Sequence, residues 1–376
     1  MKAGLNGGGG ATSGRTIYFN MRFLTQPVSG MQRYAEELIA ALDAGLAEDP
    51  CRLGGARLVG LVPDGTVRSR DWRTIEIRRT GRLGGHAWEQ VDLARGARDG
   101  LLVSLAGSGP LAHPRHVLAI HDANLYVNPH FYSRPYRVWH GMLRPRLARR
   151  ARGLITISAF SRGELARWCG LSEDRFEIVP DSAEHILGVA PDPGVLARHG
   201  LAPGRYALCV GNQSPNKNIA LAIEAFAALA PEGVRLAVAG GTAKALARAR
   251  TVEAPWLSML GRVSDGELRA LYENAAVFVF PSIYEGFGVP PLEAMALGCP
   301  VVSSDSSAMP EVLGDAALFF KSGDARACAA RIAEVLGLDA AGRARIADAG
   351  RAQAGRYRWH RSAERLGTML RALEAA

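Results

Sequence analysis

The segment that holds Glu285 and Glu293 constrains the fold more than any other part of this 376-residue chain. Residues 276–280 are all apolar, which predicts a buried strand. Residues 292–297 predict a short helix, because the glycine that follows them commonly ends a helix. The seven residues between Glu285 and Glu293 include two glycines and two prolines. A strand, a glycine-rich loop and a helix in this order are typical of α/β proteins.

This segment also predicts a binding site for a phosphate. The backbone N–H groups at a helix N-terminus point toward one spot and carry a partial positive charge. Glu285 and Glu293 can accept hydrogen bonds from hydroxyl groups of the molecule that carries the phosphate. Each glutamate alone has a structural explanation, since Glu293 falls in the first turn of the predicted helix and Glu285 suits an exposed loop. Their combination after a buried strand favours function.

Apolar runs alternate with helical patterns along the chain, which predicts parallel sheets with crossover helices. Strands are predicted at residues 16–19, 58–62, 101–105, 117–120, 154–157, 176–179, 206–210, 236–239, 277–280 and 300–303. Helices are predicted at residues 31–46, 219–229, 267–273 and 327–336, and from residue 359 onward. The prolines of residues 180–203 predict a hinge between two similar halves.

We therefore predict two α/β domains, one at residues 15–185 and one at residues 186–358. The helix at residues 359–376 is predicted to pack back on the first domain. Residues 1–14 are rich in glycine, alanine and serine and are predicted to be disordered. The apolar runs fall short of the ~20 residues that span a bilayer, and the N-terminus shows no secretory segment. Two capping boxes are predicted, Ser161 with Glu164 and Ser264 with Glu267.

Composition excludes some functions and leaves others open. The five cysteines are scattered without CxxC spacing, which fits a reducing compartment and a cytoplasmic location. No HExxH motif or carboxylate cluster occurs, so we expect no bound metal. The net charge of +9 favours anionic partners, although an arginine-rich proteome explains it equally well. No nucleic-acid-binding module accompanies this charge, so no nucleic-acid partner is expected.

Four candidate residues follow predicted strands, at the sheet edge where α/β proteins bind ligands. His121 follows the strand at 117–120, Lys217 the strand at 206–210, and Glu285 the strand at 277–280. Gly30 starts the helix after the first strand, although a simple turn explains this glycine equally well. Two candidates come from each half of the chain, which predicts a cleft between two facing domains.

Lys217 and His121 can each be explained without a functional role. Lys217 precedes a helix whose N-terminal dipole opposes a cation, so it is either a solvated lysine or a ligand for a bound diphosphate. His121 can hydrogen-bond a sugar hydroxyl with Asp122 fixing its tautomer, but a lone histidine is more often structural.

The segment between Arg134 and Arg152 holds seven arginines among aromatic and apolar residues. A basic amphipathic segment of this kind can contact an anionic membrane, and it can also be an ordinary solvated helix.

Together these motifs resemble family 4 of the retaining glycosyltransferases, which have the two-domain GT-B fold of facing Rossmann-like domains. The most specific match runs from Phe280 to Glu293 and continues at residues 298–302 and 309–312. Residues 210–218, the pair His121–Asp122 and residues 30–34 also fit. The resemblance covers most of the chain after residue 14.

The resemblance implies roles for these residues in binding a nucleotide-sugar donor. Glu285 would contact the transferred sugar, Glu293 the ribose, and His121 the donor sugar near the reacting carbon. Lys217 would neutralise the departing diphosphate, and Gly30 would line the phosphate and acceptor side. The remaining donor-binding residues would be Asn212, Val263 near the base, and Gly286, Phe287, Gly288 and Val289 through their backbone. Many relatives carry an arginine close to Asn212, so the diphosphate contacts differ here.

The resemblance further implies transfer with retention of configuration, without a metal or another cofactor. Residues 23–34 resemble members that build bacterial surface polysaccharides. The expected donor is GDP-mannose, and the expected acceptor is a glycan or a polyprenyl-diphosphate-linked oligosaccharide at the inner face of the cell membrane. UDP- or dTDP-sugars, with rhamnosyl, glucosyl or galactosyl transfer, remain alternatives, as does a non-catalytic protein that binds nucleotide-sugars or glycans.

Two other classes of enzyme fit the sequence poorly. A Rossmann oxidoreductase needs GxGxxG directly after the first strand, whereas the dense glycine run at residues 7–10 precedes that strand. A P-loop phosphotransferase needs GxxxxGK[ST], which the sequence lacks.

Overall fold

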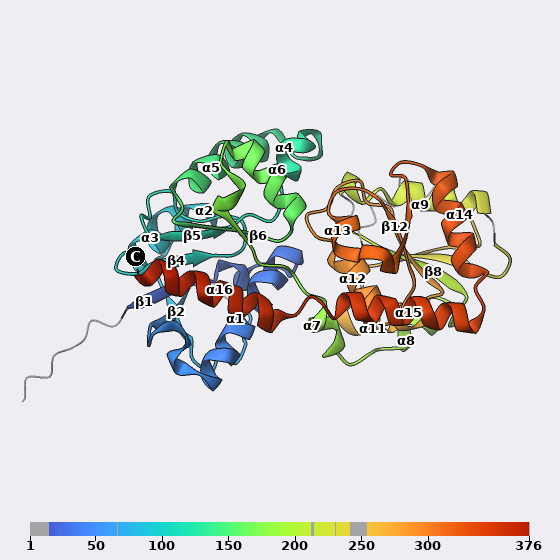
Figure 1. The fold of residues 1–376 in the computed structure, drawn as a ribbon, viewed down its shortest axis with the longest axis horizontal. Helices are drawn as coiled ribbons and strands as arrows, with labels where there is room; N and C mark the ends of the chain where they lie inside the picture. The colour runs from blue at the N-terminus through green and yellow to red at the C-terminus, as the bar shows by residue number, and fades with distance from the viewer. Residues whose placement is uncertain (1–14, 66, 212–213, 230, 241–253, 376) are drawn as a thin grey trace, which may run out of the picture. The chain divides into compact units, whose positions relative to one another are not determined.

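The computed structural model describes residues 15–65, 67–211, 214–229, 231–240 and 254–375. It contains two parallel sheets with helices, which confirms the α/β prediction (Figure 1). One sheet has seven strands in the order β3-β2-β1-β4-β5-β6-β7, and the other has six in the order β10-β9-β8-β11-β12-β13. The predicted disorder of residues 1–14 lies outside the described residues.

The strands of the seven-stranded sheet follow the sequence prediction except at one edge. Its strands are β1 (Thr16–Asn20), β2 (Arg57–Val62), β3 (Glu76–Arg79), β4 (Leu101–Ser104), β5 (His116–Ala119), β6 (Gly153–Thr156) and β7 (Phe176–Ile178). The edge strand β3 was not predicted, because its sequence EIRR carries one apolar residue. Tyr18 of β1 pairs in parallel with Val59 on one side and Leu102 on the other.

In the six-stranded sheet, the strands at both edges were not predicted. Its strands are β8 (Tyr206–Val210), β9 (Arg235–Ala239), β10 (Leu257–Gly261), β11 (Val277–Phe280), β12 (Val301–Ser304) and β13 (Ala317–Phe320). The four inner strands were predicted. The edge strands β10 and β13 were missed. Ser258 interrupts the apolar run of β10, whereas the sequence ALFF of β13 is apolar throughout.

Helices pack on each sheet through apolar faces. The α-helices are α1 (Gly30–Glu48), α2 (Gly85–Trp88), α3 (Ala94–Gly96), α4 (Asn124–Val127), α5 (Arg134–Arg150), α6 (Ala159–Cys169), α7 (Glu184–Leu187), α8 (Gly194–Arg198), α9 (Ile219–Leu229), α11 (Asp265–Asn274), α12 (Val289–Ala296), α13 (Met309–Leu313), α14 (Ala325–Leu336), α15 (Ala340–Ala354) and α16 (Trp359–Ala375). Short turns are η1 (Arg22–Thr25), η2 (Pro50–Leu53), the π-helical η3 (Glu89–Leu93), η4 (Pro129–Phe131), η5 (Glu173–Arg175), η6 (Pro215–Lys217) and η7 (Gly314–Ala316). Around the second sheet, Phe226, Val238 and Ile332 belong to one buried apolar cluster, and each such side chain stabilises the fold by about 1.5–3 kcal/mol.

One of the two predicted capping boxes is present and the other is wrong. Ser264 and Glu267 form the reciprocal hydrogen bonds of a capping box at the start of α11. Helix α6, in contrast, begins at Ala159, where Ser158 is the N-cap and accepts a hydrogen bond from Ser161 N at 3.0 Å. The S-x-x-E pattern at Ser161 therefore lies inside a helix that starts one turn earlier than this pattern indicates.

The chain divides into two compact units. The first contains Met1–Ala119, Arg150–Leu154 and Ala363–Ala376, and the second contains Ile120–Arg149 and Ile155–Ser362. Within the first unit α16 lies along α1 (Figure 1), and a Cβ on Gly367 would lie 3.7 Å from Leu42. The domain boundaries at residues 185 and 358 stay a prediction.

Candidate functional site

The loop after β11 turns sharply into α12. Gly288 has φ +95°, a conformation that favours glycine, and a Cβ at this position would also collide with Met309 Cε. Helix α12 begins at Val289, three residues earlier than predicted, because Pro290 and Pro291 suit the first helical turn. The helix has no acidic residue in that turn. The structural explanation given for Glu293 from a first-turn position is therefore wrong.

Lys217 and Glu285 form an ion pair at this loop. Lys217 Nζ lies 2.6 Å from Glu285 Oε1, and the side chains are 18% and 14% exposed. Lys217 Nζ also lies 5.4 Å from the centroid of the Phe280 ring. Partial burial makes the attraction between the charges stronger than that of an exposed pair. The structure thus brings together two residues that the sequence proposed separately.

Hydrogen bonds from backbone and side-chain groups hold the two loops that carry this pair. Ile283 N donates to Asn216 O at 2.8 Å, and Asn216 Nδ2 donates to Tyr284 O at 3.1 Å. Glu285 N donates to Ser307 Oγ at 3.0 Å. Asn216 and Ser307 were not predicted, because nothing in the sequence separates them from other polar loop residues.

The loop also abuts the segment that follows β5. A Cβ on Gly286 would lie 2.9 Å from Asp122 Cβ and 3.0 Å from His121 O. His121 is buried, as expected for a residue at the end of a buried strand. Asp122 Oδ1 accepts a hydrogen bond from Asn124 N at 2.9 Å. Its role in fixing the His121 tautomer stays a prediction.

The N-terminus of α6 contacts the same loop. Ser158 Oγ and Ser161 Oγ donate to Gly286 O at 2.6 and 3.2 Å. Glu311 accepts hydrogen bonds from Ala159 N at 2.7 Å and Phe160 N at 2.9 Å, which places an anion where the helix dipole stabilises it.

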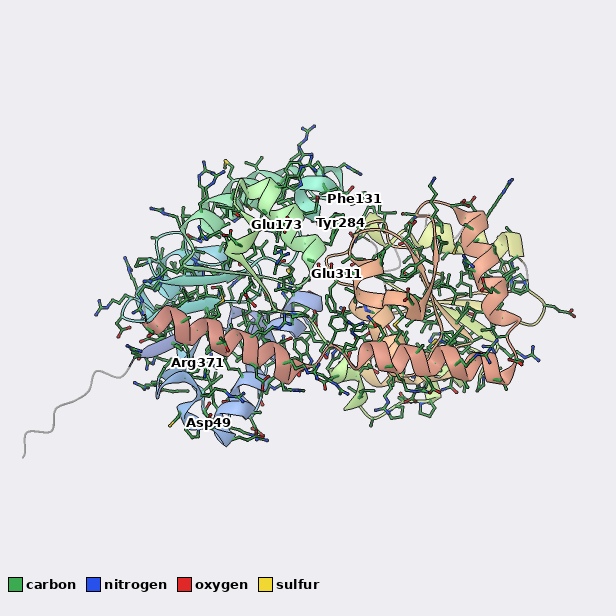
Figure 2. The ribbon with its side chains drawn as sticks, viewed as in Figure 1. Asp49, Phe131, Glu173, Tyr284, Glu311 and Arg371 are labelled. Atoms are coloured by element: carbon green, nitrogen blue, oxygen red, sulfur yellow. The ribbon has the colours of Figure 1, made fainter. Side chains whose placement is uncertain are left out.

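Figure 2 labels Tyr284 and Glu311 in this region, and the rings of Phe160 and Tyr284 lie edge to face with centroids 5.6 Å apart. Nothing in the sequence indicated that α6 would meet this loop.

Glu293 is held by two side chains that were not predicted from the sequence. Its Oε1 lies 2.7 Å from His185 Nε2, and its Oε2 accepts a hydrogen bond from Tyr272 OH at 3.0 Å. Glu293 is buried, and both partners satisfy the charge that burial would otherwise destabilise. Burial and then the charge of Glu293 raise the pKa of Tyr272 well above its usual value, so its hydroxyl keeps the proton it donates. A carboxylate has about four acceptor positions, so capacity remains for a ligand.

The other predicted residues differ in burial and position. Gly30 is the first residue of α1 in the first unit, and no atom lies within 4 Å of its Cβ position. Val263 lies half-buried between β10 and α11. Phe287 is buried with its ring 5.1 Å from that of Tyr357, so only its backbone can serve a ligand. Asn212 lies outside the described residues.

Three other kinds of site find little support in the part of the chain that is described. No group of three or more histidine, cysteine or acidic side chains there could hold a metal ion. No helix among those residues has the length and apolar character needed to cross a membrane. Burial raises the pKa of the Cys209 and Cys299 thiols to about 12, so both remain protonated and unreactive.

The fold and the relatives of the chain define it as a glycosyltransferase. The chain belongs to the family described as glycosyl transferases group 1, whose sequence model matches residues 199–353. It is 30% identical to O-antigen chain mannosyltransferase B of Escherichia coli over 375 residues, which covers 91% of this chain and 96% of the relative. It is 27% identical to O-antigen chain mannosyltransferase RfbU of Salmonella typhimurium over 55% of this chain and 57% of the relative.

Solved structures show that the fold is GT-B. Sucrose-phosphate synthase from Thermosynechococcus elongatus superposes with a TM-score of 0.73 at 19% identity, over 96% of this chain and 99% of that one. Anabaena HepE in complex with UDP and glucose superposes with a TM-score of 0.68 at 17% identity, over 95% of this chain and 99% of that one.

Replacing Gly286 by alanine is expected to destabilise the protein. The added methyl group would displace His121 O, Asp122 Cβ and Ser161 Oγ, and overpacking of this kind costs about 1–3 kcal/mol. Gly141→Ala is the matched control, because Gly141 is helical and no atom lies within 4 Å of its Cβ position. Thermal unfolding should show a lower midpoint for the Gly286 variant only. A midpoint of Gly286→Ala equal to that of the wild type would contradict the close approach of the loop to residues 121 and 122.

Proposed function

We propose that this glycosyltransferase moves a mannosyl group from GDP-mannose to a glycan or polyprenyl-diphosphate-linked acceptor in the synthesis of a bacterial surface polysaccharide. The observation that carries the proposal is the Lys217–Glu285 pair beside the glycine loop that leads into α12. The mannosyl specificity is supported by the two O-antigen mannosyltransferases among the relatives, one of them aligned over nearly its whole length.

The ion pair suggests how the donor is bound and activated. A diphosphate beside Lys217 Nζ would compete with Glu285 for the cation, since both are anions within reach of one ammonium group. Glu285 would then be able to accept hydrogen bonds from sugar hydroxyls. Lys217, the loop amides and the N-terminal end of α12 would stabilise the charge that develops on the departing diphosphate. Such positioning and electrostatic stabilisation can supply most of the catalysis, and we propose a retaining transfer that needs no metal.

Glu293 and His121 complete the proposed donor site. Tyr272 and His185 fix the Glu293 carboxylate, so it can receive the ribose hydroxyls with little loss of side-chain freedom. His121 lies against Gly286, next to the loop proposed to hold the sugar and diphosphate. Three further residues take part in this proposal. Gly30 would line the phosphate and acceptor side, Asn212 would bind the donor, and Val263 would lie near the base.

The donor base is the least constrained part of this proposal. Lys217 and Glu285 would contact the diphosphate and a sugar hydroxyl, which all nucleotide-sugars share. UDP- and dTDP-sugars therefore remain alternatives to GDP-mannose. A non-catalytic binding protein is the second alternative. The joint presence of His121, Lys217, Glu285 and Glu293 argues against it, because a protein that only binds has no need to keep a complete site.

Helix α5 supports a contact with an anionic membrane. Val138, Trp139 and Met142 are exposed on it. Its segment holds seven arginines and no acidic residue between Arg134 and Arg152. Basic residues are attracted to anionic lipid by about 1 kcal/mol each, and exposed apolar side chains can enter the interface. We accordingly place the enzyme in the cytoplasm, at the inner face of the cell membrane.

A panel of nucleoside diphosphates tests the donor. GDP should raise the thermal unfolding midpoint more than UDP, dTDP or ADP at equal concentration, because a ligand that binds only the folded state stabilises it by mass action. A larger shift with UDP or dTDP would overturn the mannosyl assignment and keep the enzyme class. No shift with any of them would contradict the donor site itself.

Alanine variants of the ion pair test catalysis. Lys217→Ala and Glu285→Ala should each lose turnover by about 100-fold or more, the usual cost of removing one group that stabilises transition-state charge. Lys321→Ala and Glu334→Ala are matched controls, since both side chains are exposed. The readout is release of nucleoside diphosphate from GDP-mannose. Unchanged turnover in both site variants would refute the assignment.

A further inference from the structure

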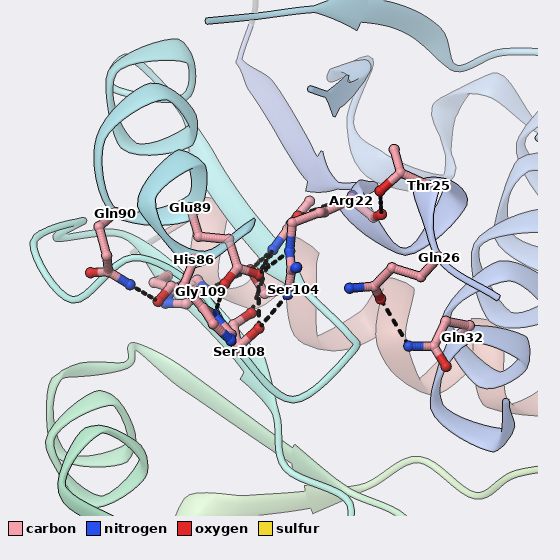
Figure 3. Close-up of polar contacts among 12 residues, drawn as sticks. Arg22, Thr25, Gln26, Gln32, His86, Glu89, Gln90, Ser104, Ser108 and Gly109 are labelled. Carbon is pink, nitrogen blue, oxygen red and sulfur yellow. Dashed lines mark hydrogen bonds and ion pairs between the residues drawn. The ribbon is translucent and has the colours of Figure 1, made fainter. Parts of the chain in front are cut away.

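A second polar cluster lies in the first unit at the carboxyl edge of the seven-stranded sheet (Figure 3). Asn20 ends β1 and Ser104 ends β4, and ligands of parallel α/β sheets bind beyond this edge. We call the following six residues the edge cluster: Asn20, Arg22, His86, Glu89, Ser104 and Ser108. None of them was singled out from the sequence.

Glu89 is the centre of the edge cluster. Only 1% of the residue is exposed. Its Oε1 accepts hydrogen bonds from Asn20 Nδ2 at 3.2 Å, Arg22 Nε at 3.0 Å and Ser108 Oγ at 2.8 Å. Its Oε2 lies 2.8 Å from His86 Nδ1. Burial alone would raise the pKa of Glu89, but the hydrogen bond from His86, the charge of Arg22 and the hydrogen bonds from Ser108 and Asn20 outweigh it and lower this pKa. Glu89 is therefore ionised at neutral pH.

A buried charged network stabilises a fold less than apolar packing, because the charges lose their hydration. Replacing such a network by apolar residues of similar volume is often neutral or stabilising by about 1–4 kcal/mol. The apolar cluster of Tyr18, Trp88 and Leu102 already supplies a core on this sheet. Glu89 also opens the π-helical turn η3, a geometry found frequently at functional sites. Stability alone therefore does not explain the edge cluster.

The edge cluster orients one side chain that reaches the surface. An ionised carboxylate can only accept hydrogen bonds, so His86 Nδ1 is the donor and carries a proton. The His86 side chain is 38% exposed, whereas that of Glu89 is 2% exposed. Gly84 and Gly85 precede His86, and no atom lies within 4 Å of either Cβ position. Glu89 thus holds a histidine in one orientation at an open rim.

Further polar groups continue from the edge cluster toward the start of α1. Gln32 Nε2 donates to Gln26 Oε1 at 2.9 Å, and Gln26 follows the turn that holds Arg22 (Figure 3). A Cβ on Gly107 would lie 3.5 Å from Met31 Sδ. The loop that carries Ser108 therefore lies beside the helix start at Gly30, for which the family resemblance implies a position on the phosphate and acceptor side.

We propose that the edge cluster binds the acceptor glycan through its hydroxyl groups. The charge balance selects this ligand: Arg22 and Glu89 cancel each other, and the amide and hydroxyl side chains are neutral, whereas a phosphate would need an excess of cations. His86 and Arg22 contact the acceptor, and Glu89 is a positioning residue that acts through them. The inference rests on the proposed glycosyl transfer.

The test measures binding of p-nitrophenyl α-mannoside by saturation-transfer NMR with GDP present. The wild type should bind the mannoside, and His86→Ala and Glu89→Gln should each weaken binding at least about fivefold, the effect of one lost hydrogen bond. The double variant should lose less than the sum of the two single losses, because Glu89 acts in part through His86, whereas two independent structural effects would add. Glu76→Gln, in the exposed Arg57–Glu76 pair, is the matched control and should bind as the wild type does.

Each outcome decides the inference. No saturation transfer to the mannoside from the wild type would overturn it, and so would unchanged affinity in His86→Ala. Additive losses in the double variant would overturn the positioning role of Glu89. A cooperative thermal unfolding transition shows that each variant is folded. An absent GDP shift with intact mannoside binding would count against the donor proposal alone.

Discussion

The attraction between Lys217 and Glu285 is the interaction on which the rest of the site depends. The two side chains come from loops that follow β8 and β11, which are neighbours in the six-stranded sheet. Parallel neighbours place their carboxyl ends together, so residues 68 positions apart in sequence meet at 2.6 Å. Because the same loop also contacts His121 through Gly286, a single backbone turn gathers the groups that a nucleotide-sugar would need.

Much of this arrangement could be predicted from local sequence. Inner strands are buried on both faces and show as continuous apolar runs, whereas the edge strands β3 and β10 carry polar residues and were missed. The edge strand β13 was also missed, although its sequence ALFF is apolar throughout. Three residues could be recognised from local sequence: Glu285 and Glu293 flank a glycine-rich loop after a strand, and Lys217 precedes a helix. The residues that contact them could not be recognised in this way. His185 reaches Glu293 across 108 residues, and such a pair exists only through tertiary packing. The false capping box at Ser161 shows the converse, since a local pattern can fit while the helix starts elsewhere.

Two of the carboxylate–cation pairs, Arg22–Glu89 and Lys217–Glu285, differ in what they can do. Glu89 is almost fully buried and its oxygens have four partners, so it fixes the shape of its surroundings. Glu285 is 14% exposed and paired with a lysine, whose flexible ammonium group can move to another anion. The first pair suits the orientation of a neutral ligand, and the second suits exchange of one anion for another. Each lies at the carboxyl edge of its own sheet, which is where the proposed acceptor and donor chemistry is expected.

A crystal structure of the protein with GDP tests the central claim most directly. The account predicts diphosphate oxygens within hydrogen-bond distance of Lys217 Nζ and of the amides of residues 286–288. It also predicts a distance between Lys217 Nζ and Glu285 Oε1 longer than the present 2.6 Å. A diphosphate bound elsewhere, with the ion pair unchanged, would contradict it.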